Sequence, residues 1–298
     1  MTDSLKAHIS LFAAQVIYAL NYSIAKDLMP NFMGPGALVF LRVLGACLLF
    51  WSVSLFIPSE KIQKGDMMKL MLLAVFGVAC NQLCFIFGLN LTLPINSAII
   101  MTSNPIVVTV FTLIVLKERV TIFKVSGIAL GICGALTLML MSGKRFGFGN
   151  ETAMGDLLTL VNSTSWAVFV VMAKPYMQKY QTVTVMKWIF FFGMFLVAPF
   201  GWTDLLSTNF AVFTPHAWFA LFFVVVATTF LAYLLNTYAL KALSPSTVSA
   251  YIYMQPFLAT FFALIFGKDS LTLYKILAGG LIIAGVYLAG KKPKAGGV

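Results

Sequence analysis

A long stretch of this sequence occurs twice and indicates the fold. Residues 94–134 read PINSAIIMTSNPIVVTVFTLIVLKERVTIFKVSGIALGICG, and residues 245–285 read PSTVSAYIYMQPFLATFFALIFGKDSLTLYKILAGGLIIAG. The two stretches align without a gap at a separation of 151 positions, and 12 of their 41 residues are identical. The matches include prolines, lysines and a glycine, which apolar composition alone does not produce. The sequence therefore indicates an internal duplication.

The rest of the chain is as apolar as the duplicated stretch. Apolar residues make up 60% of the 298 positions and charged residues only 10%, far below the roughly 25% of soluble proteins. A membrane-crossing helix needs about 20 mostly apolar residues. Ten segments satisfy this requirement: 8–27, 36–57, 67–89, 94–116, 121–141, 155–176, 185–201, 216–240, 245–266 and 271–290. We predict an all-α membrane protein with ten transmembrane helices.

The duplication divides these helices into two sets of five. A separation of 148 positions pairs Tyr18 with Trp166 and Lys26 with Lys174, so the copies also match in their first helices. We place the first copy at residues 1–145 and the second at 146–298. Because five is odd, the second copy enters the membrane from the opposite side, as in the inverted repeats of secondary transporters.

The basic residues predict the orientation. Fourteen of the 20 lysines and arginines fall on the side of the N-terminus and five on the other side, which predicts that both termini are cytoplasmic. The net charge of +11 is spread singly between apolar segments, so we expect the lipid bilayer as partner and no nucleic acid. The cysteines and histidines lack metal-ligand spacing, and no catalytic motif of an intramembrane enzyme is present, so we expect no metal, no cofactor and no enzymatic activity.

Two prolines near the middle of membrane segments indicate hinges. A proline inside a helix removes one amide donor and clashes with the carbonyl four residues before it. Pro105 and Pro256 are equivalent in the two copies, and each follows a primary amide, Asn104 and Gln255. Since a buried amide is costly without a partner, we expect both amides to face the interior and both prolines to act in gating.

Further amides and aromatic residues recur in the apolar segments and indicate a polar cavity. Gln15, Tyr18 and Tyr22 share one face of the first helix, and Asn162 and Trp166 share one face of its repeat partner. The alternative is that such residues form ordinary hydrogen bonds between helices, worth about 0.6 kcal/mol each. The full set of candidate substrate-binding residues is Gln15, Tyr18, Asn21, Tyr22, Gln82, Asn104, Asn162, Trp166, Tyr233, Tyr251 and Gln255.

Arg42 is the one charged residue well inside an apolar segment. Its long side chain either extends to the membrane surface or attracts a carboxylate of the substrate. All nine acidic residues fall in termini, loops or helix ends. A proton-coupled carrier needs a titrating group in the membrane, so we expect facilitated transport or coupling through another group.

Together these features resemble the EamA-type permeases of the drug/metabolite transporter superfamily. The resemblance rests on residues 18–26 and 166–174, on Pro105 and Pro256, and on the acidic Glu118 and Asp269, although Asp269-Ser270 replaces the Glu-Arg pair in the second copy. The resemblance implies a central pathway through the bundle. It also implies a permease of the inner membrane, which exports small organic metabolites such as amino acids by alternating access. An exporter of drug-like hydrophobic or cationic compounds is the alternative.

Helices five and ten are rich in glycine, which permits close approach of helices. We expect these glycines either to close each five-helix half internally, which we favour, or to join two copies of the chain. The protein is accordingly expected to be a monomer or a homodimer.

Overall fold

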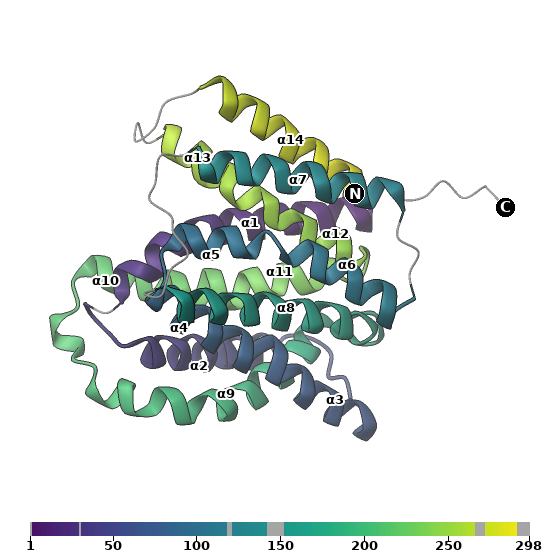
Figure 1. Ribbon diagram of the computed structural model, residues 1–298. Coiled ribbons are helices and arrows are strands. Elements are labelled where there is room, and N and C mark those ends of the chain that lie inside the picture. Colours follow the sequence, from purple (N-terminus) through teal and green to yellow (C-terminus); the bar gives the residue numbers. More distant parts are fainter. Residues whose placement is uncertain (1, 30, 118–120, 142–151, 266–271, 291–298) are drawn as a thin grey trace.

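The computed structural model describes residues 2–29, 31–117, 121–141, 152–265 and 272–290, and within these ranges every regular element is helical. Glu118 and Asp269, which carry part of the family resemblance, lie outside the described residues, as do residues 142–151 between the two copies. The helices form one elongated bundle whose long axis runs across Figure 1.

Helix covers each of the ten predicted segments. The elements are α1 (Asp3–Leu28), α2 (Pro35–Ser54), α3 (Lys64–Ala74), η1 (Val75–Cys80), α4 (Asn81–Leu91), α5 (Pro94–Met101), α6 (Asn104–Val115), α7 (Ile122–Leu140), α8 (Ala153–Lys179), α9 (Thr182–Ser207), η2 (Phe210–Val212), α10 (Pro215–Phe222), η3 (Phe223–Leu231), α11 (Ala232–Ala239), α12 (Pro245–Ala250), η4 (Tyr251–Tyr253), α13 (Met254–Ile265) and α14 (Leu273–Gly290).

Eight of these segments are long and apolar enough to cross a membrane. They comprise all the predicted spans except α1 and the run from α12 to α13. Large apolar side chains also remain on the outside of the bundle, among them Ile114, which is 67% exposed, and Leu277, which is 61% exposed. Such a surface suits lipid rather than water. The chain is therefore an all-α, multi-pass membrane protein.

The sequence determines where several helices begin. Proline occupies the first turn of α2, α10 and α12, where its missing amide hydrogen is not needed. The hydroxyl groups of Thr214 and Ser244 accept hydrogen bonds from the amides of Ala217 and Thr247, which caps α10 and α12.

The two mid-membrane prolines interrupt their helices as predicted. In the first copy, α5 ends at Met101 and α6 begins at Asn104, directly before Pro105. In the second copy the short 3-10 helix η4 precedes α13, which contains Pro256. Both interruptions lie at the same depth of their segments because the segments are copies of each other.

Two π-helices at equivalent positions were not predicted. The segment η1 lies between α3 and α4, and η3 lies between α10 and α11. A separation of 151 places Val75–Cys80 on residues 226–231 of η3. A π-helix has more residues per turn than an α-helix and frequently occurs at functional sites. The duplication therefore preserves an irregularity that apolar patterning does not reveal.

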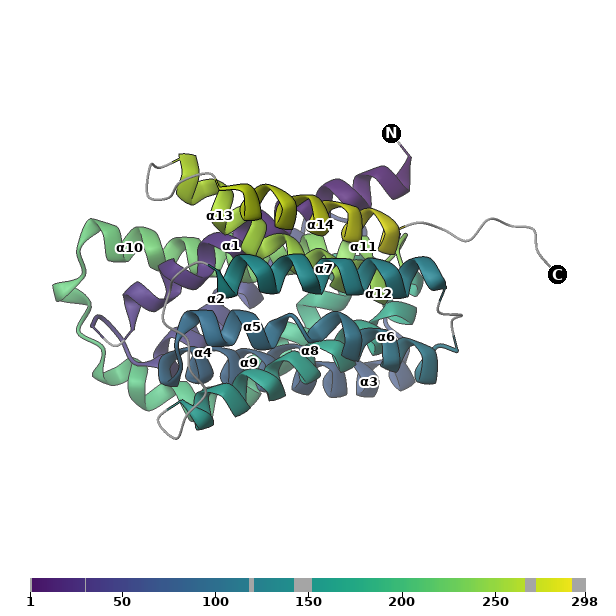
Figure 2. The same ribbon diagram turned by 45° about the horizontal axis from the view of Figure 1, so that its top comes forward.

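The glycine-rich helices join the two copies. Figures 1 and 2 both show α14 lying along α7, and these two helices are in extensive contact. A Cβ atom on Gly127 would lie 2.6 Å from the carbonyl oxygen of Gly285, and one on Gly285 would lie 2.6 Å from the amide nitrogen of Gly131. The expectation that these glycines seal each half internally was wrong, because their close contact is between the halves.

The first helices of the two copies run in opposite directions. The ammonium group of Lys174, near the end of α8, donates hydrogen bonds of 2.7 Å to the carbonyl oxygens of Leu240 and Leu243. Asp3, at the start of α1, shares a surface hollow with the neighbouring Lys241. Hence α8 ends where α1 begins. We call this end of the bundle the near end and the opposite end the far end.

Candidate functional site

A cavity of about 80 Å³ lies in the middle of the bundle. One water needs roughly 10–15 Å³, so the space can hold several waters or a small solute. Its lining combines amides, aromatic rings, one arginine and a few aliphatic side chains. The lining residues are Gln15, Tyr18, Asn21, Arg42, Asn81, Gln82, Phe85, Met101, Asn162, Trp166, Thr228, Tyr233, Asn236, Val248, Ile252 and Gln255.

The structure brings most of the predicted binding residues together in this cavity. Those that line it are Gln15, Tyr18, Asn21, Gln82, Asn162, Trp166, Tyr233 and Gln255. The side chain of Tyr22 lies outside the described part of the chain. Met101 and Ile252, which lie four positions before Pro105 and Pro256, also line the cavity. The backbone interruptions are therefore at the cavity wall.

Two predicted residues lie elsewhere. Asn104 is fully buried and donates a hydrogen bond of 2.6 Å from Nδ2 to the carbonyl oxygen of Ser163, so it fastens α6 to α8. The hydroxyl group of Tyr251 is 2.7 Å from Nδ1 of His8 and joins η4 to α1. For these two residues the structure shows contacts between helices rather than cavity lining.

A hydrogen-bonded group around Tyr233 forms one wall of the cavity. Gln82 Nε2 donates to the Tyr233 hydroxyl at 2.6 Å, and that hydroxyl donates to Asn81 Oδ1 at 2.7 Å. The ring of Trp166 meets the ring of Tyr233 edge to face, with their centroids 5.3 Å apart. These contacts hold the side chains of both copies in fixed positions, which preorganises the wall.

Side chains of the second copy satisfy backbone groups around the π-helix of the first copy. Ser165 Oγ donates to the carbonyl oxygen of Phe76 at 2.7 Å, and Asn162 Nδ2 donates to that of Asn81 at 2.8 Å. In η3 the hydroxyl of Thr229 donates to the carbonyl oxygen of Val224 at 2.7 Å. Buried carbonyls in a membrane protein need such partners.

The two copies contribute equivalent positions to the cavity. Four pairs related by the duplication line it together: Tyr18 with Trp166, Gln82 with Tyr233, Phe85 with Asn236, and Met101 with Ile252. Sequence reasoning missed Phe85, Thr228 and Val248 because they carry no distinctive motif. The repeat would have indicated Phe85 as the counterpart of the polar Asn236.

Arg42 lies inside the cavity. Its side chain is only 2% exposed, and Nε donates to the hydroxyl oxygen of Thr229 at 2.9 Å. Its Nη1 atom has no hydrogen-bond partner among the described residues. The interpretation that Arg42 extends to the membrane surface was wrong, because its side chain lines the cavity instead.

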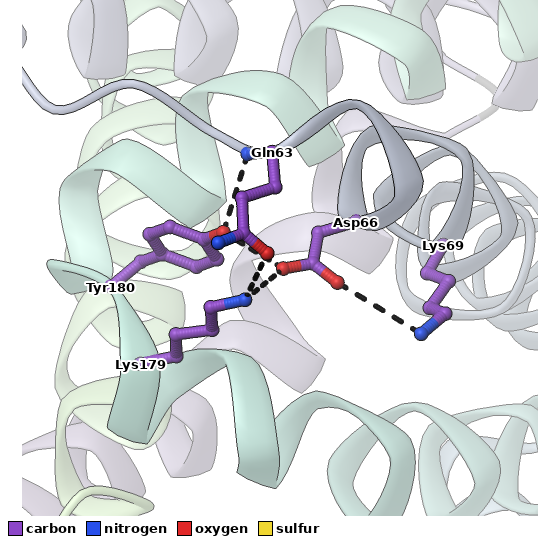
Figure 3. Close-up of polar contacts among 5 residues, drawn as sticks. All are labelled: Gln63, Asp66, Lys69, Lys179 and Tyr180. Atoms are coloured by element: carbon purple, nitrogen blue, oxygen red, sulfur yellow. Dashed lines mark hydrogen bonds and ion pairs between the residues drawn. The ribbon is translucent and has the colours of Figure 1, made fainter.

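A charged cluster ties the two copies together at the near end (Figure 3). One carboxylate oxygen of Asp66 accepts hydrogen bonds from Lys179 Nζ and from the Tyr180 hydroxyl, each at 2.7 Å. The ammonium group of Lys179 also donates to Gln63 Oε1 at 2.7 Å, and Lys69 lies 3.9 Å from the other Asp66 oxygen. This Asp66 cluster connects the start of α3 to the end of α8.

The far end carries two contacts between the copies. Asp156, in the first turn of α8, accepts hydrogen bonds from the hydroxyls of Thr92 at 2.6 Å and Thr152 at 2.9 Å. Asp27, at the end of α1, lies 4.0 Å from His216 in α10, and both side chains are largely exposed. The first contact is compact, whereas the second is loose.

Within the described ranges, no group of three or more histidine, cysteine, aspartate or glutamate side chains is arranged to hold a metal ion. Among the described residues that line the cavity there is no cysteine, histidine or carboxylate. Its chemistry is that of binding through amides, hydroxyls, rings and one guanidinium group.

A lipid-facing helical bundle with a duplicated sequence and a central polar cavity defines the class of multi-pass membrane transporters. The model of the EamA-like transporter family matches the chain twice, over residues 5–140 and 153–290. The chain belongs to this family, which confirms the predicted relationship.

Curated relatives extend over nearly the whole chain. An uncharacterized transporter of Archaeoglobus fulgidus is 27% identical, with 96% of this chain and 98% of that protein aligned. Protein WALLS ARE THIN 1 of Arabidopsis thaliana is 22% identical over 96% of this chain and 82% of its own. A solved structure described as "Crystal structure of protein" shares the fold, with a TM-score of 0.77 and 17% identity over 95% of this chain and 96% of that one.

Proposed function

We propose that this protein is a secondary transporter of the inner membrane that moves small organic metabolites, such as amino acids, by alternating access. Its direction is export in this proposal, as in the resemblance drawn from the sequence, and both termini are cytoplasmic. The observation that carries the proposal is the central cavity, whose wall is built from equivalent positions of two copies that run in opposite directions.

The proposed architecture has ten membrane-spanning helices in two inverted repeats. Helix α1 and the run from α12 to α13 complete the eight apolar spans. Contacts between helices support the symmetry: α8 packs against α4 and α6, and α1 packs against their counterparts α11 and α13. Likewise α2 packs against α9, and α7 against α14. Exchanging the two copies leaves this pattern of contacts unchanged.

Reporter fusions test the architecture directly. Leu140 ends the fifth helical segment and Ala289 lies at the end of the tenth. Inverted repeats predict a periplasmic reporter after Leu140 and a cytoplasmic reporter after Ala289. If a cytoplasm-specific reporter is active at both positions, the inverted arrangement is wrong, and if it is active after Leu140 alone, the orientation is wrong.

Alternating access requires each end of the bundle to open in turn. The Asp66 cluster joins the two copies at the near end, and the Asp156 and Asp27 contacts join them at the far end. Opening either end separates hydrogen-bonded or paired groups and exposes them to water, which replaces their partners at modest cost. The polar contacts at the two ends thus have the chemistry of reversible gates.

Transport is tested with the purified protein in proteoliposomes loaded with a mixed metabolite pool. We expect release or uptake of specific solutes, and at least a tenfold loss in Trp166→Ala, because this ring forms the cavity wall. Trp202→Ala is the matched control, since Trp202 is 52% exposed on the outside. Unchanged transport in a folded Trp166→Ala protein would show that the cavity is not the pathway.

The aromatic wall also suits hydrophobic cations, which stack on aromatic faces. An exporter of drug-like hydrophobic or cationic compounds is therefore the second candidate. The same proteoliposomes, offered tetraphenylphosphonium in place of metabolites, distinguish the two. Saturable movement of this cation, without movement of any metabolite, would favour the second candidate.

A further inference from the structure

The described lining of the cavity carries a positive charge and no negative one. Arg42 contributes a guanidinium group, and none of the described lining residues is acidic. Arginine keeps its charge in proteins, so this site carries a fixed positive charge. Arg42 donates a hydrogen bond to Thr229, and Thr229 donates one to the backbone of η3. These two bonds orient the guanidinium group, but they do not neutralise its charge.

A buried charge without a counter-ion is unfavourable in a membrane protein and marks a functional site. The planar guanidinium group matches a carboxylate, to which it donates two parallel hydrogen bonds. The unpartnered Nη1 of Arg42 supplies a free donor for such a ligand. Because the wall provides no carboxylate, the ligand has to bring one.

The remaining wall offers complementary groups. Asn21 Oδ1, Gln82 Oε1 and Asn162 Oδ1 are buried acceptors without a hydrogen-bond partner among the described residues, and all three side chains line the cavity. They suit the donors of an ammonium group. Phe85 and Trp166 add apolar surface. A zwitterion with an apolar side chain satisfies all three kinds of group.

We propose that Arg42 binds the carboxylate of the substrate, that the substrates are organic carboxylates with apolar side chains, α-amino acids above all, and that amines without a carboxylate are excluded. This inference rests on the proposed transport function and deepens it. It also selects the metabolite candidate over the cationic one, since a guanidinium group repels a cation in a space with little water.

A set of matched ligands tests the proposal. Each of leucine, phenylalanine, methionine and tryptophan is compared with the amine that lacks its carboxylate and with the acid that lacks its amino group. Binding to the purified protein is measured as ligand-induced thermal stabilisation, and transport is measured in proteoliposomes. We expect the wild type to bind amino acids best, the matched acids more weakly, and the amines at least tenfold more weakly than the acids.

Two substitutions of Arg42 separate its charge from its shape. Arg42→Gln is expected to weaken carboxylate binding at least tenfold and to reduce the discrimination against amines. Arg42→Lys keeps the positive charge but lacks the planar guanidinium group, so it is expected to weaken carboxylate binding less than Arg42→Gln does. If Arg42→Gln does not fold, Thr229→Val replaces it, with an expected loss of a fewfold because the guanidinium group is no longer oriented.

The outcomes distinguish this proposal from the transport function itself. If the wild type binds amines as well as acids, or binds no acid, Arg42 is not a carboxylate site. The same holds if folded Arg42→Gln keeps the affinity for leucine. Should the vesicles nevertheless move other metabolites, only the substrate class is wrong. If no solute crosses at all, the transport proposal fails as well.

Discussion

The equivalent first helices of the two repeats, α1 and α8, are attached to the opposite repeat very differently. Helix α8 is held along its whole length, by the Asp66 cluster at one end, by Asp156 at the other, and by Asn104, Asn162 and Ser165 in between. The contacts of described α1 side chains with the second repeat are neutral or exposed. They include His8 with Tyr251, Gln15 with Gln255, Tyr18 with Asn236, and the loose pair of Asp27 and His216.

Under the proposed alternating access, this difference predicts which contacts separate first. Charge-assisted hydrogen bonds are roughly twice as strong as neutral ones. The charge-assisted hydrogen bonds of Asp66 and Asp156 attach α8 to α3 and to the end of α4. Helix α8 is therefore attached more strongly to the first repeat than α1 is to the second. Helix α1 carries Gln15, Tyr18 and Asn21 into the cavity on weaker attachments. We expect the contacts along α1 to separate before those of Asp66 and Asp156.

The largest effect is expected at Gly155, where α8 touches the end of α4. A Cβ atom there would lie 2.8 Å from backbone atoms of Leu91 and Thr92. We expect Gly155→Leu to push α8 from α4 and to lower the free energy of unfolding by about 1–3 kcal/mol. The measurement is the thermal unfolding midpoint of the detergent-solubilised protein.

Gly280→Leu is the control for Gly155→Leu, because a Cβ atom on Gly280 has nothing within 4 Å. Both changes raise helix propensity equally, by about 1 kcal/mol, so their difference isolates the packing of α8. Equal melting temperatures for the two variants would contradict the close contact between α8 and α4.

The next largest effect separates two equivalent amides. Asn104→Ala leaves the carbonyl of Ser163 without its partner and is expected to cost about 1–2 kcal/mol of stability, with little change in the substrate affinity of the folded fraction. Gln255→Ala is expected to show the reverse, because Gln255 lines the cavity and its amide donates to the side chain of Gln15 rather than to a backbone carbonyl. Melting curves and ligand titrations on both variants test this. Identical behaviour would mean that the repeats are equivalent in function as well as in backbone.

A smaller effect is expected from Asp66→Asn, which keeps the side-chain shape but weakens the contact with Lys179. We expect more frequent opening of the near end. A single cysteine at position 101 on the cavity wall, in a background without Cys47, Cys80, Cys84 and Cys133, reports this opening. Labelling by an impermeant maleimide from the cytoplasmic side should be faster in Asp66→Asn, and an unchanged rate would exclude the Asp66 cluster as a gate.

The smallest effect is expected from Asp27→Asn at the end of α1. The separation of 4.0 Å from His216 and the exposure of both side chains limit what this pair contributes, since exposed ion pairs are worth about 0–1 kcal/mol. We expect an unchanged melting temperature and unchanged labelling from the far side. A loss of stability as large as that of Asn104→Ala would show that α1 is as firmly held as α8.

Much of the architecture could be predicted from the residues because its causes are local. Apolar length determines which segments become long helices, and a proline interrupts its own helix wherever that helix packs. Because the sequence is duplicated, each of these predictions also applied to the equivalent segment of the second copy. The candidate binding side chains were chosen in the same way, since polar groups in apolar segments are few, and most of the candidates line one cavity.

The sequence by itself therefore determined the helices, their two copies, the positions of the proline interruptions and the choice of polar residues available for binding. Only the tertiary structure decided which of these face the cavity. Each residue turns an α-helix by about 100°, and a π-helix such as η1 changes the rotation of everything that follows it. Packing between helices sets the rest: α6 packs against α8, where Asn104 is bound, and α13 packs against α1, where Gln255 meets Gln15 at the cavity. Arg42 lies inside because its helix packs against η3, where its side chain is bonded to Thr229.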